Sequence, residues 1–394
     1  ENNTWIAPKD YQEGTHQIKD SLYGNFINTG FKAYLYMLNQ GKQTGDYTES
    51  DRLLDAIKKS QAKYGSEVML SDDKINAELL YNKYDVFKKL FSWYMYAGTL
   101  MFILLIVQIF KTRNKTVDVA IKVFKYIILF LFVIHTLGLI ARWYISGHAP
   151  WSDAYESMIY VAWATMLFGL LFGRKSDITF ASTAFVASMI LMIAHWNWMD
   201  PAIANLQPVL NSYWLMIHVA IIVGSYGPFT LGMILGLVSL LLMIFTNKEN
   251  KDKMLLNIKE LTVINEMSLT VGLVMLTIGN FLGGMWANES WGRYWGWDPK
   301  ETWALISIMI YAFVIHMRLI PGLRSRWTFN IWSVVAFSSI IFTYFGVNFY
   351  LAGLHSYQSG QQVGSIKFIA IAVFIVFVIG LLSYRKYNRY FKKS

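Results

Sequence analysis

Long apolar runs alternate with short polar connectors over most of this chain, starting near residue 91. A helix needs roughly 20 mostly apolar residues to cross a bilayer, and these runs have about that length. They occupy residues 92–110, 121–144, 156–172, 178–196, 213–245, 261–283, 302–320, 327–349 and 367–384. The pattern predicts an all-α polytopic membrane protein with about nine transmembrane helices.

The first 90 residues have a different pattern, because polar and apolar residues are mixed there without a long apolar run. Two segments, 51–64 and 73–90, carry apolar residues at helical spacing. We expect a small helical region on the outer surface of the membrane, acting as a cap or linker. The sequence therefore divides into an extracytoplasmic region at 1–90 and a transmembrane domain at 91–394.

Composition and charge agree with a membrane protein. Hydrophobic residues make up 55% of the chain and aromatic residues 16%, which is more than an ordinary soluble domain carries. The net charge of +10 could indicate a nucleic-acid partner, but Lys and Arg gather in short clusters between the apolar runs. A nucleic-acid surface would collect them along one helix or stripe, so we expect no nucleic-acid partner.

The basic clusters also predict which side of the membrane each connector faces. They lie at 111–115, 174–175, 248–259, 318–326 and 385–393. All of these fall on one side, which the positive-inside rule assigns to the cytoplasm. The alternate connectors, at 145–156, 197–212, 284–301 and 350–366, are poor in Lys and Arg and are expected to face outward.

The chain contains no cysteine, so it has no disulfide framework, CxxC pair or thiolate nucleophile of its own. Any thiol chemistry must come from a partner. The sequence starts at Glu1 without a basic and then apolar signal region. We expect it to be a piece of a longer polypeptide.

Tryptophans concentrate in the predicted outer segment 284–303. Five of the 15 in the chain lie there, namely Trp286, Trp291, Trp295, Trp297 and Trp303. Indole rings in a polar connector that contains glycines need a large apolar object to cover them. An aromatic belt at the membrane interface would explain isolated tryptophans elsewhere in the chain, but not five in one connector.

Charged residues in and near this segment give the expected guest a polar edge. Asp298 and Glu301 could act as an acid and a base, but we favour a simpler role at the start of the seventh span, because carboxylates stabilise a helix N-terminus. The cations Arg293, Lys300 and Arg142 could pair with carboxylates of the guest. The expected guest is flat and mostly apolar, with charged edges.

Two histidines are predicted at the level of the tryptophans. His218 lies near the outer end of the fifth span, and His355 follows the eighth span. Two neutral imidazoles can bind a haem iron from opposite faces. His316 lies nearer the cytoplasmic end of the seventh span and cannot share this site. For His135, within the second span, a bond to a neighbouring helix and a functional role are equally favoured.

The run Trp291-Gly-Arg-Tyr-Trp295-Gly-Trp297-Asp298-Pro-Lys-Glu301 resembles the signature of the WWD-domain haem-handling membrane proteins. Together with Gly147-His148-Ala-Pro150 and Tyr155-Glu156-Ser157, it makes residues 75–394 most similar to CcsA-type cytochrome c synthases of system II cytochrome c biogenesis. That family carries haem b across the bacterial cytoplasmic membrane. On the periplasmic face it joins haem to the two cysteines of a CxxCH segment in an apocytochrome c.

The resemblance implies roles for individual residues and partners. It makes His218 and His355 the axial ligands of the outer haem, and His316 a ligand of an intramembrane haem. In fused members, a second intramembrane histidine belongs to a CcsB-type half that this chain lacks. The chain therefore resembles the C-terminal part of a fused CcsBA-type protein or a separate subunit, with thiol-reducing proteins as further expected partners.

The residues and the resemblance together predict a cytochrome c haem-lyase. The two outer histidines would hold the iron and the tryptophans would cover the ring, so that catalysis is mainly positioning. The predicted haem-binding set is His218, His355, His316, Trp286, Trp291, Arg293, Trp295, Trp297, Asp298, Glu301, Trp303 and Arg142. Two alternatives stay open: a haem exporter or chaperone without attachment activity, and a non-haem envelope transporter or glycosyl enzyme.

Overall fold

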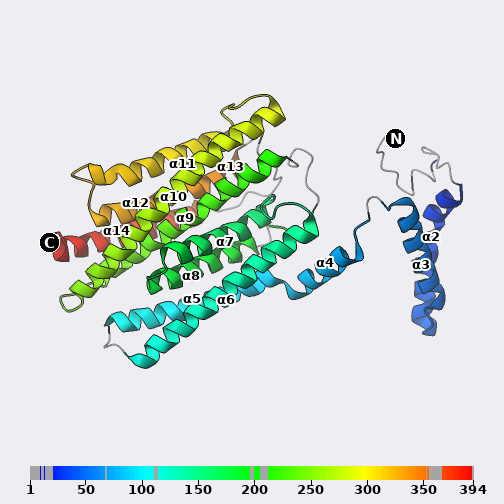
Figure 1. Cartoon of the computed structure of the whole chain (residues 1–394), viewed down its shortest axis with the longest axis horizontal. Helices are drawn as coiled ribbons and strands as arrows, with labels where there is room; N and C mark the ends of the chain where they lie inside the picture. Colours follow the sequence, from blue (N-terminus) through cyan, green and yellow to red (C-terminus); the bar gives the residue numbers. More distant parts are fainter. Residues whose placement is uncertain are drawn as a thin grey trace. The chain divides into compact units, whose positions relative to one another are not determined.

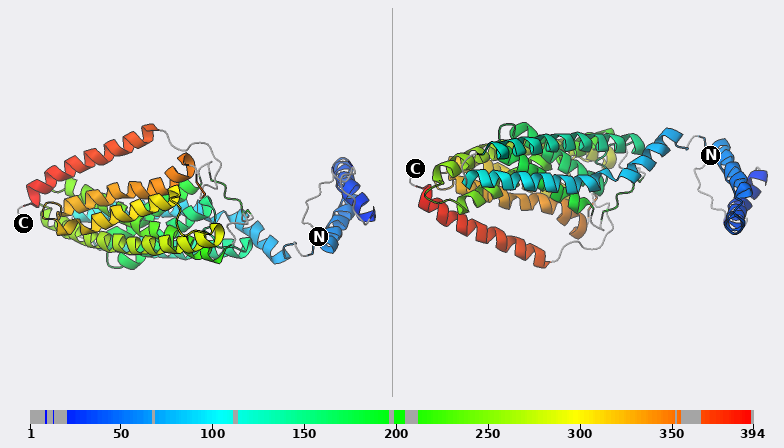
Figure 2. Two further views of the ribbon diagram at one scale, coloured as in Figure 1. Left: turned by 90° about the horizontal axis from the view of Figure 1, so that it is seen from above. Right: turned by 90° about the horizontal axis from the view of Figure 1, so that it is seen from below.

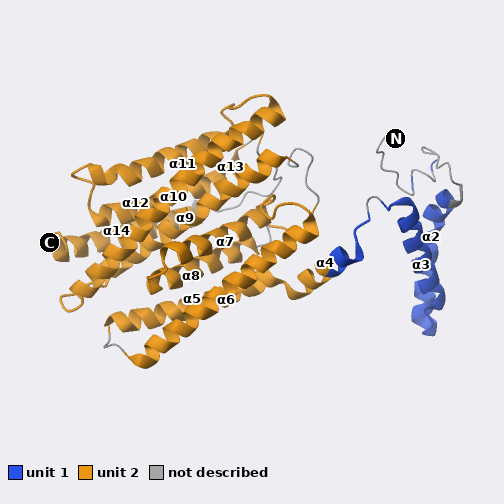
Figure 3. Cartoon of the chain, in the orientation of Figure 1, with its two compact units in different colours: residues 1–76 blue, residues 77–394 orange. Residues whose placement is uncertain are grey.

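The computed structural model describes residues 9, 13, 21–66, 69–110, 114–195, 199–204, 212–351, 353–354 and 366–392. The chain divides into two compact units, residues 1–76 and residues 77–394 (Figure 3). Throughout the described residues the regular elements are helices, without a strand. The all-α prediction is therefore confirmed.

The first unit contains α2 (Ser21–Thr44) and α3 (Thr48–Tyr64), which pack against each other. The rings of Tyr23 and Tyr64 stack with their centroids 3.8 Å apart. The helix predicted at 51–64 is confirmed as α3, whereas α2 was not predicted. The outer location of residues 1–90 stays a prediction.

A single helix at 73–90 was predicted, and this is wrong. The structure has α4 (Asp72–Tyr84) and α5 (Val86–Phe110), separated at Asp85. Asp85 has a positive φ of 41°, a left-handed conformation that aspartate tolerates better than most residues. The apolar spacing continues across this break, so the pattern alone could not show it.

The second unit is a bundle of long helices (Figure 1). Nine helices of the described residues are long and apolar enough to cross a membrane, which confirms the predicted spans. The main helices of these spans are α5, α6 (Lys115–Ser146), α7 (Ala154–Phe172), α8 (Asp177–Ala194), α9 (Tyr213–Ile244), α10 (Lys251–Trp291), α11 (Pro299–His316), α12 (Arg326–Ile341) and α14 (Ile366–Tyr390), and the eighth span extends from α12 to Tyr350. A short 3₁₀ turn (Met317–Leu319) follows α11, and α12 continues through a π-helical turn (Phe342–Gly346) into α13 (Val347–Tyr350).

Helix α9 forms the centre of the bundle and packs against α7, α10, α12 and α14. Its most apolar window is 78% buried, against 11% for α14. Figure 2 shows α14, in red, along the outside of the bundle. The bundle therefore buries most of α9 and leaves α14 with most of its surface for lipid or a partner.

The connectors of the bundle fall into two groups (Figure 1). The α9–α10 and α11–α12 connectors lie at the same end as the last turn of α14, and they carry the basic clusters. The α6–α7 and α10–α11 connectors lie at the opposite end. Helices α9 and α11 therefore both begin at the end of the bundle that is poor in Lys and Arg.

Glycines allow neighbouring helices of the bundle to approach closely, as small residues do in membrane proteins. A Cβ atom added to Gly98 of α5 would lie 2.8 Å from the backbone nitrogen of Phe185 on α8. One added to Gly227 of α9 would lie 2.7 Å from the backbone carbonyl carbon of Ala164 on α7. Backbone atoms cannot swing aside as a flexible side chain can, so each pair of helices would have to separate.

We expect Gly98→Ala to destabilise the protein by about 1–3 kcal/mol, the usual cost of overpacking a tight contact. The matched control is Gly322→Ala in the α11–α12 connector, where an added Cβ would meet no atom within 4 Å. Thermal unfolding of both variants in detergent measures the difference. Equal melting temperatures for the two variants would contradict the close α5–α8 contact.

Candidate functional site

A large cavity lies at the end of the bundle that is poor in Lys and Arg, between α7, α9, α10, α11 and the α12–α13 segment. The empty space in the cavity and at its open mouth, solvent included, is about 1710 Å³. Most of its wall is apolar or aromatic. Polar residues at the wall include His148, Asp153, His218, Asn280, Lys300, Glu301 and Asn348.

His218 of α9 is held in the cavity wall by two residues of α10. Its ring stacks on the indole of Trp286, with centroids 5.7 Å apart and an angle of 15° between the planes. Gly283 faces the other part of the ring, since an added Cβ would lie 3.0 Å from Nδ1. Trp286 itself is fully buried and packs edge-on against Trp291 at 4.7 Å. The imidazole therefore has an aromatic support and a defined position.

The predicted connector at 284–301 starts too early, and this prediction is wrong. Helix α10 continues to Trp291 and ends at Gly292, which has a φ of 69°. A glycine in this left-handed conformation is a common way to end a helix. Trp286 and Trp291 are consequently helical residues, and the helix fixes their directions.

The structure does not bring the five tryptophans to one surface. Trp286 and Trp295 line the cavity. Trp303 packs on Phe342 with centroids 4.1 Å apart, and the side chain of Trp297 is 70% exposed. The cavity wall therefore has two of the five indoles, with Trp151, Tyr294 and Tyr344 as additional aromatic residues.

Asp298 and Glu301 start helix α11 through a capping box, which confirms the role favoured from the sequence. Asp298 Oδ2 accepts a hydrogen bond from the backbone N–H of Lys300 at 3.3 Å, and Glu301 Oε2 accepts one from the N–H of Asp298 at 3.2 Å. Asp298 Oδ1 also accepts from the N–H of Leu354 at 2.6 Å. The carboxylate thus ties the segment after α13 to the start of α11.

The three cations predicted to meet a carboxylate guest have different surroundings. Arg293 Nη1 lies 3.2 Å from Glu301 Oε1, and its guanidinium lies over Trp291. It does not belong to the cavity wall. Lys300 does line the cavity, where Nζ donates to Asn348 Oδ1 at 2.8 Å.

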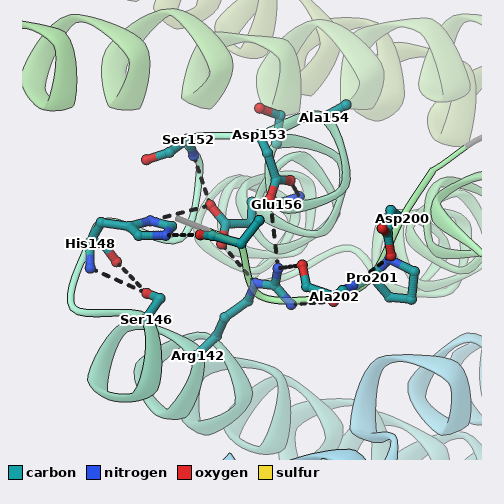
Figure 4. Close-up of polar contacts among 12 residues, drawn as sticks. Arg142, Ser146, His148, Ser152, Asp153, Ala154, Glu156, Asp200, Pro201 and Ala202 are labelled. Atoms are coloured by element: carbon teal, nitrogen blue, oxygen red, sulfur yellow. Dashed lines mark hydrogen bonds and ion pairs between the residues drawn. The ribbon is translucent and has the colours of Figure 1, made fainter. Parts of the chain in front are cut away.

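Arg142 lies outside the cavity wall in a fully buried ion pair (Figure 4). Its Nε donates to Glu156 Oε1 at 2.8 Å, and its two Nη groups donate to the carbonyl oxygens of Pro201 and Ala202. Both charged side chains are completely buried. The guanidinium is therefore engaged by the protein and does not face the cavity.

The other carboxylate oxygen of Glu156 connects this ion pair to the cavity wall. It accepts from the N–H of Ser152 at 2.9 Å and lies 3.8 Å from His148 Nδ1 (Figure 4). Asp153 caps α7 by accepting from the N–H of Glu156 at 2.7 Å. Burial, and then the nearby Glu156 carboxylate, raise the pKa of Asp153 to about 6. The connector before α7 therefore presents His148 and Asp153 to the cavity in fixed positions.

Of the remaining predicted histidines, the structure describes His316 and His135, and neither belongs to the cavity wall. His316 is exposed on the outside of the bundle, and its Nδ1 is 2.7 Å from the carbonyl oxygen of Ala312. His355 lies outside the described residues. His135 is fully buried, with Nε2 3.1 Å from the carbonyl oxygen of Ile159. That bond between helices supports the structural reading of His135.

Sequence reasoning missed several residues of the cavity wall, including Gly283, Asn280, Tyr294 and Asn348. Gly283 and Gly284 form a pair in an otherwise apolar helix, one turn before Trp286. This pair was an available signal, because glycine in a helix interior usually marks a close approach. Asn348 had no such signal, since its pairing with Lys300 joins residues 48 positions apart.

Comparison with known proteins identifies the family. A family model described as "Cytochrome C assembly protein" matches residues 151–355, which include every cavity residue named above except His148. The chain belongs to the cytochrome c assembly protein family. The resemblance to CcsA-type proteins is confirmed, and the chain is accordingly a multi-pass membrane protein of cytochrome c biogenesis.

Individual members of this family match over different lengths. The chain is 43% identical to Protein NrfI of Wolinella succinogenes over 361 residues, which cover 90% of this chain and 39% of that protein. It is 33% identical to cytochrome c biogenesis protein CcsA of Prochlorococcus marinus over 291 residues, or 66% of this chain and 92% of that protein. The chain thus spans well under half the length of NrfI.

Among solved structures, a similar chain is the cytochrome c haem lyase CcmF. It matches with a TM-score of 0.48 and 13% identity over 77% of this chain and 51% of the other.

Proposed function

We propose that this chain, within a longer protein or beside a partner half, binds haem b in the cavity and attaches it to apocytochrome c. The observation that carries the proposal is the position of His218, which is fixed between Trp286 and Gly283 in the wall of a large, mostly apolar cavity. Imidazole is a common axial ligand of haem iron. Family membership supports this reading over a non-haem transporter or glycosyl enzyme.

The residues of the cavity fit haem as a substrate. The apolar and aromatic walls suit the porphyrin ring, and Trp295 belongs to that wall. We propose His218 as one axial ligand. His355 is the proposed second ligand, and the bond from Asp298 to Leu354 anchors the residue directly before it. The other tryptophans support this wall from behind or lie outside it.

The proposed reaction joins two thiols of a CxxCH segment to the two vinyl groups of haem. In each addition the S–H bond and the π bond of the vinyl group break, the sulfur bonds to the vinyl carbon next to the ring, and the thiol hydrogen moves to the terminal carbon, where it forms a C–H bond. No protein nucleophile is required, in agreement with a chain that contains no cysteine. The contribution of the protein is to hold and orient the ring and to exclude water.

We place the cavity on the periplasmic face of the bacterial cytoplasmic membrane. The support is the distribution of Lys and Arg, which collect in the connectors at the other end of the bundle. We further propose that His316, on the outside of α11, contributes to an intramembrane haem site. Its second ligand would come from a CcsB-type half, and thiol-reducing proteins would keep the apocytochrome cysteines available.

The test is covalent attachment by the full-length protein in a bacterium without its own cytochrome c assembly genes. A CxxCH reporter is co-expressed, and haem that stays on the reporter through a denaturing gel is detected by its peroxidase activity. We expect a haem-stained band with CxxCH and none with a SxxSH reporter. Haem in the purified protein without a stained reporter would indicate an exporter or chaperone, and a protein without haem absorption would overturn the proposal.

A further inference from the structure

The cavity contains one cation, Lys300, that forms no ion pair with a carboxylate of the described residues. Lys300 lies in the first turn of α11 and is half-buried, with Nζ directed to the side-chain oxygen of Asn348 at 2.8 Å. That partner is a neutral amide. Among the described residues, no carboxylate oxygen lies within 4.0 Å of Lys300 Nζ.

The neighbouring carboxylates are engaged by other groups. Glu301 accepts from Arg293 Nη1 and from the backbone N–H groups of Gly296 and Asp298. Asp298 is close enough to interact electrostatically with Lys300, but its oxygens accept from the backbone N–H groups of Leu354 and of Lys300 itself. An ammonium group has three N–H donors, so Nζ keeps donors for a ligand.

A cation in this environment is costly without an anionic partner, because the low-dielectric surroundings penalise an isolated charge. The other two cations predicted to meet the guest each have a carboxylate partner within the protein. Arg142 is paired with Glu156 at 2.8 Å and Arg293 with Glu301 at 3.2 Å, and both lie outside the cavity wall. The sequence offered all three cations as partners for a carboxylate of the guest. In the structure, only Lys300 of these three lines the cavity and has no carboxylate within ion-pair distance.

We infer that Lys300 binds a carboxylate of the cavity ligand, which, resting on the proposed function, is a propionate of haem. Asn348 holds the ammonium group in position between α11 and the α12–α13 segment. The propionates and the vinyl groups occupy opposite sides of the haem ring. A propionate at Lys300 therefore turns the vinyl edge away from α11 and leaves it for the incoming thiols, so that Lys300 acts as a positioning residue.

The experiment compares two ligands on the purified full-length protein: haem, and haem dimethyl ester, in which both propionates are esterified while the ring and iron are unchanged. Dissociation constants are measured from the visible spectrum in detergent. A charge-assisted hydrogen bond contributes about 1.5–3 kcal/mol, so the wild type should bind haem about 10- to 100-fold more tightly than the ester.

Variants then locate the group that recognises the propionate. Lys300→Gln should weaken haem binding to the level of the ester and leave ester binding unchanged, whereas Lys300→Arg should keep most of the preference. Lys253→Gln, an exposed residue in the first turns of α10, is the matched control and should behave as wild type. Melting temperatures verify that each variant is folded.

Three results would overturn the inference. Equal binding of haem and ester by the wild type would exclude a propionate anchor. A Lys300→Gln variant that weakens both ligands equally would indicate a structural role, and one that keeps the wild-type preference would place the anchor elsewhere. A wild type that binds neither ligand would instead show that the proposed function itself has failed.

Discussion

Replacing His218 with glycine is expected to lower the haem content of the purified protein by about tenfold or more and to abolish covalent attachment. The loss of a residue that only supports a metal ligand already costs about 10–100-fold in affinity or activity, so loss of the ligand itself should cost at least as much. Glycine also removes the ring that stacks on Trp286, and no other described histidine of the bundle shares that position.

Added imidazole makes this result specific. The glycine leaves a space of the size of the lost ring, beside Trp286 and Gly283, so free imidazole should restore the visible spectrum. The control is His195→Gln, because His195 ends α8 and does not belong to the cavity wall. Haem content in His218→Gly equal to that of the control would contradict ligation by His218.

Replacing Arg142 with methionine is expected to destabilise the protein by about 3–5 kcal/mol, the cost of leaving one charge of a buried pair without its partner. Glu156 would stay completely buried, with one oxygen no longer facing a cation. The carbonyl oxygens of Pro201 and Ala202 would also lose their donors. Thermal unfolding in detergent measures the loss.

The double variant Arg142→Met, Glu156→Met distinguishes a lost charge pair from a lost packing contact. Removing both charges eliminates the uncompensated carboxylate, so the double variant should be more stable than Arg142→Met alone. The exposed pair of Arg52 and Glu49, 2.7 Å apart, provides the control, and Arg52→Met should cost less than about 1 kcal/mol. A double variant with the summed loss of both single variants would contradict a coupled buried pair.

The ion pair also has a consequence for the cavity. Glu156 holds the N–H of Ser152, and Asp153 caps the helix that carries Glu156. Ser152 and Asp153 both line the cavity. Even a folded Arg142→Met protein should therefore bind haem more weakly, because the connector before α7 loses the contacts that fix it.

Local features of this protein were predictable from the sequence. The spans could be assigned because their number depends on apolar length alone, which is a property of each segment. The capping box of Asp298 and Glu301 joins residues three positions apart, so helix geometry determines it without the rest of the fold. The CcsA-type family could be recognised for a related reason, since its signature lies in one continuous segment.

Which of these residues meet at the cavity depends on how distant helices pack. The tryptophans are close in sequence, yet α10 directs Trp286 toward His218 while Trp297 faces outward. The charges of Arg142 and Lys300 look alike in the sequence. Arg142 forms an ion pair with Glu156, which lies beyond the α6–α7 connector. Lys300 instead donates to Asn348, which is 48 positions further along the chain. The spans and the family were therefore predictable from local sequence, whereas the partner of each charge and ring follows from contacts between helices that are far apart in the chain.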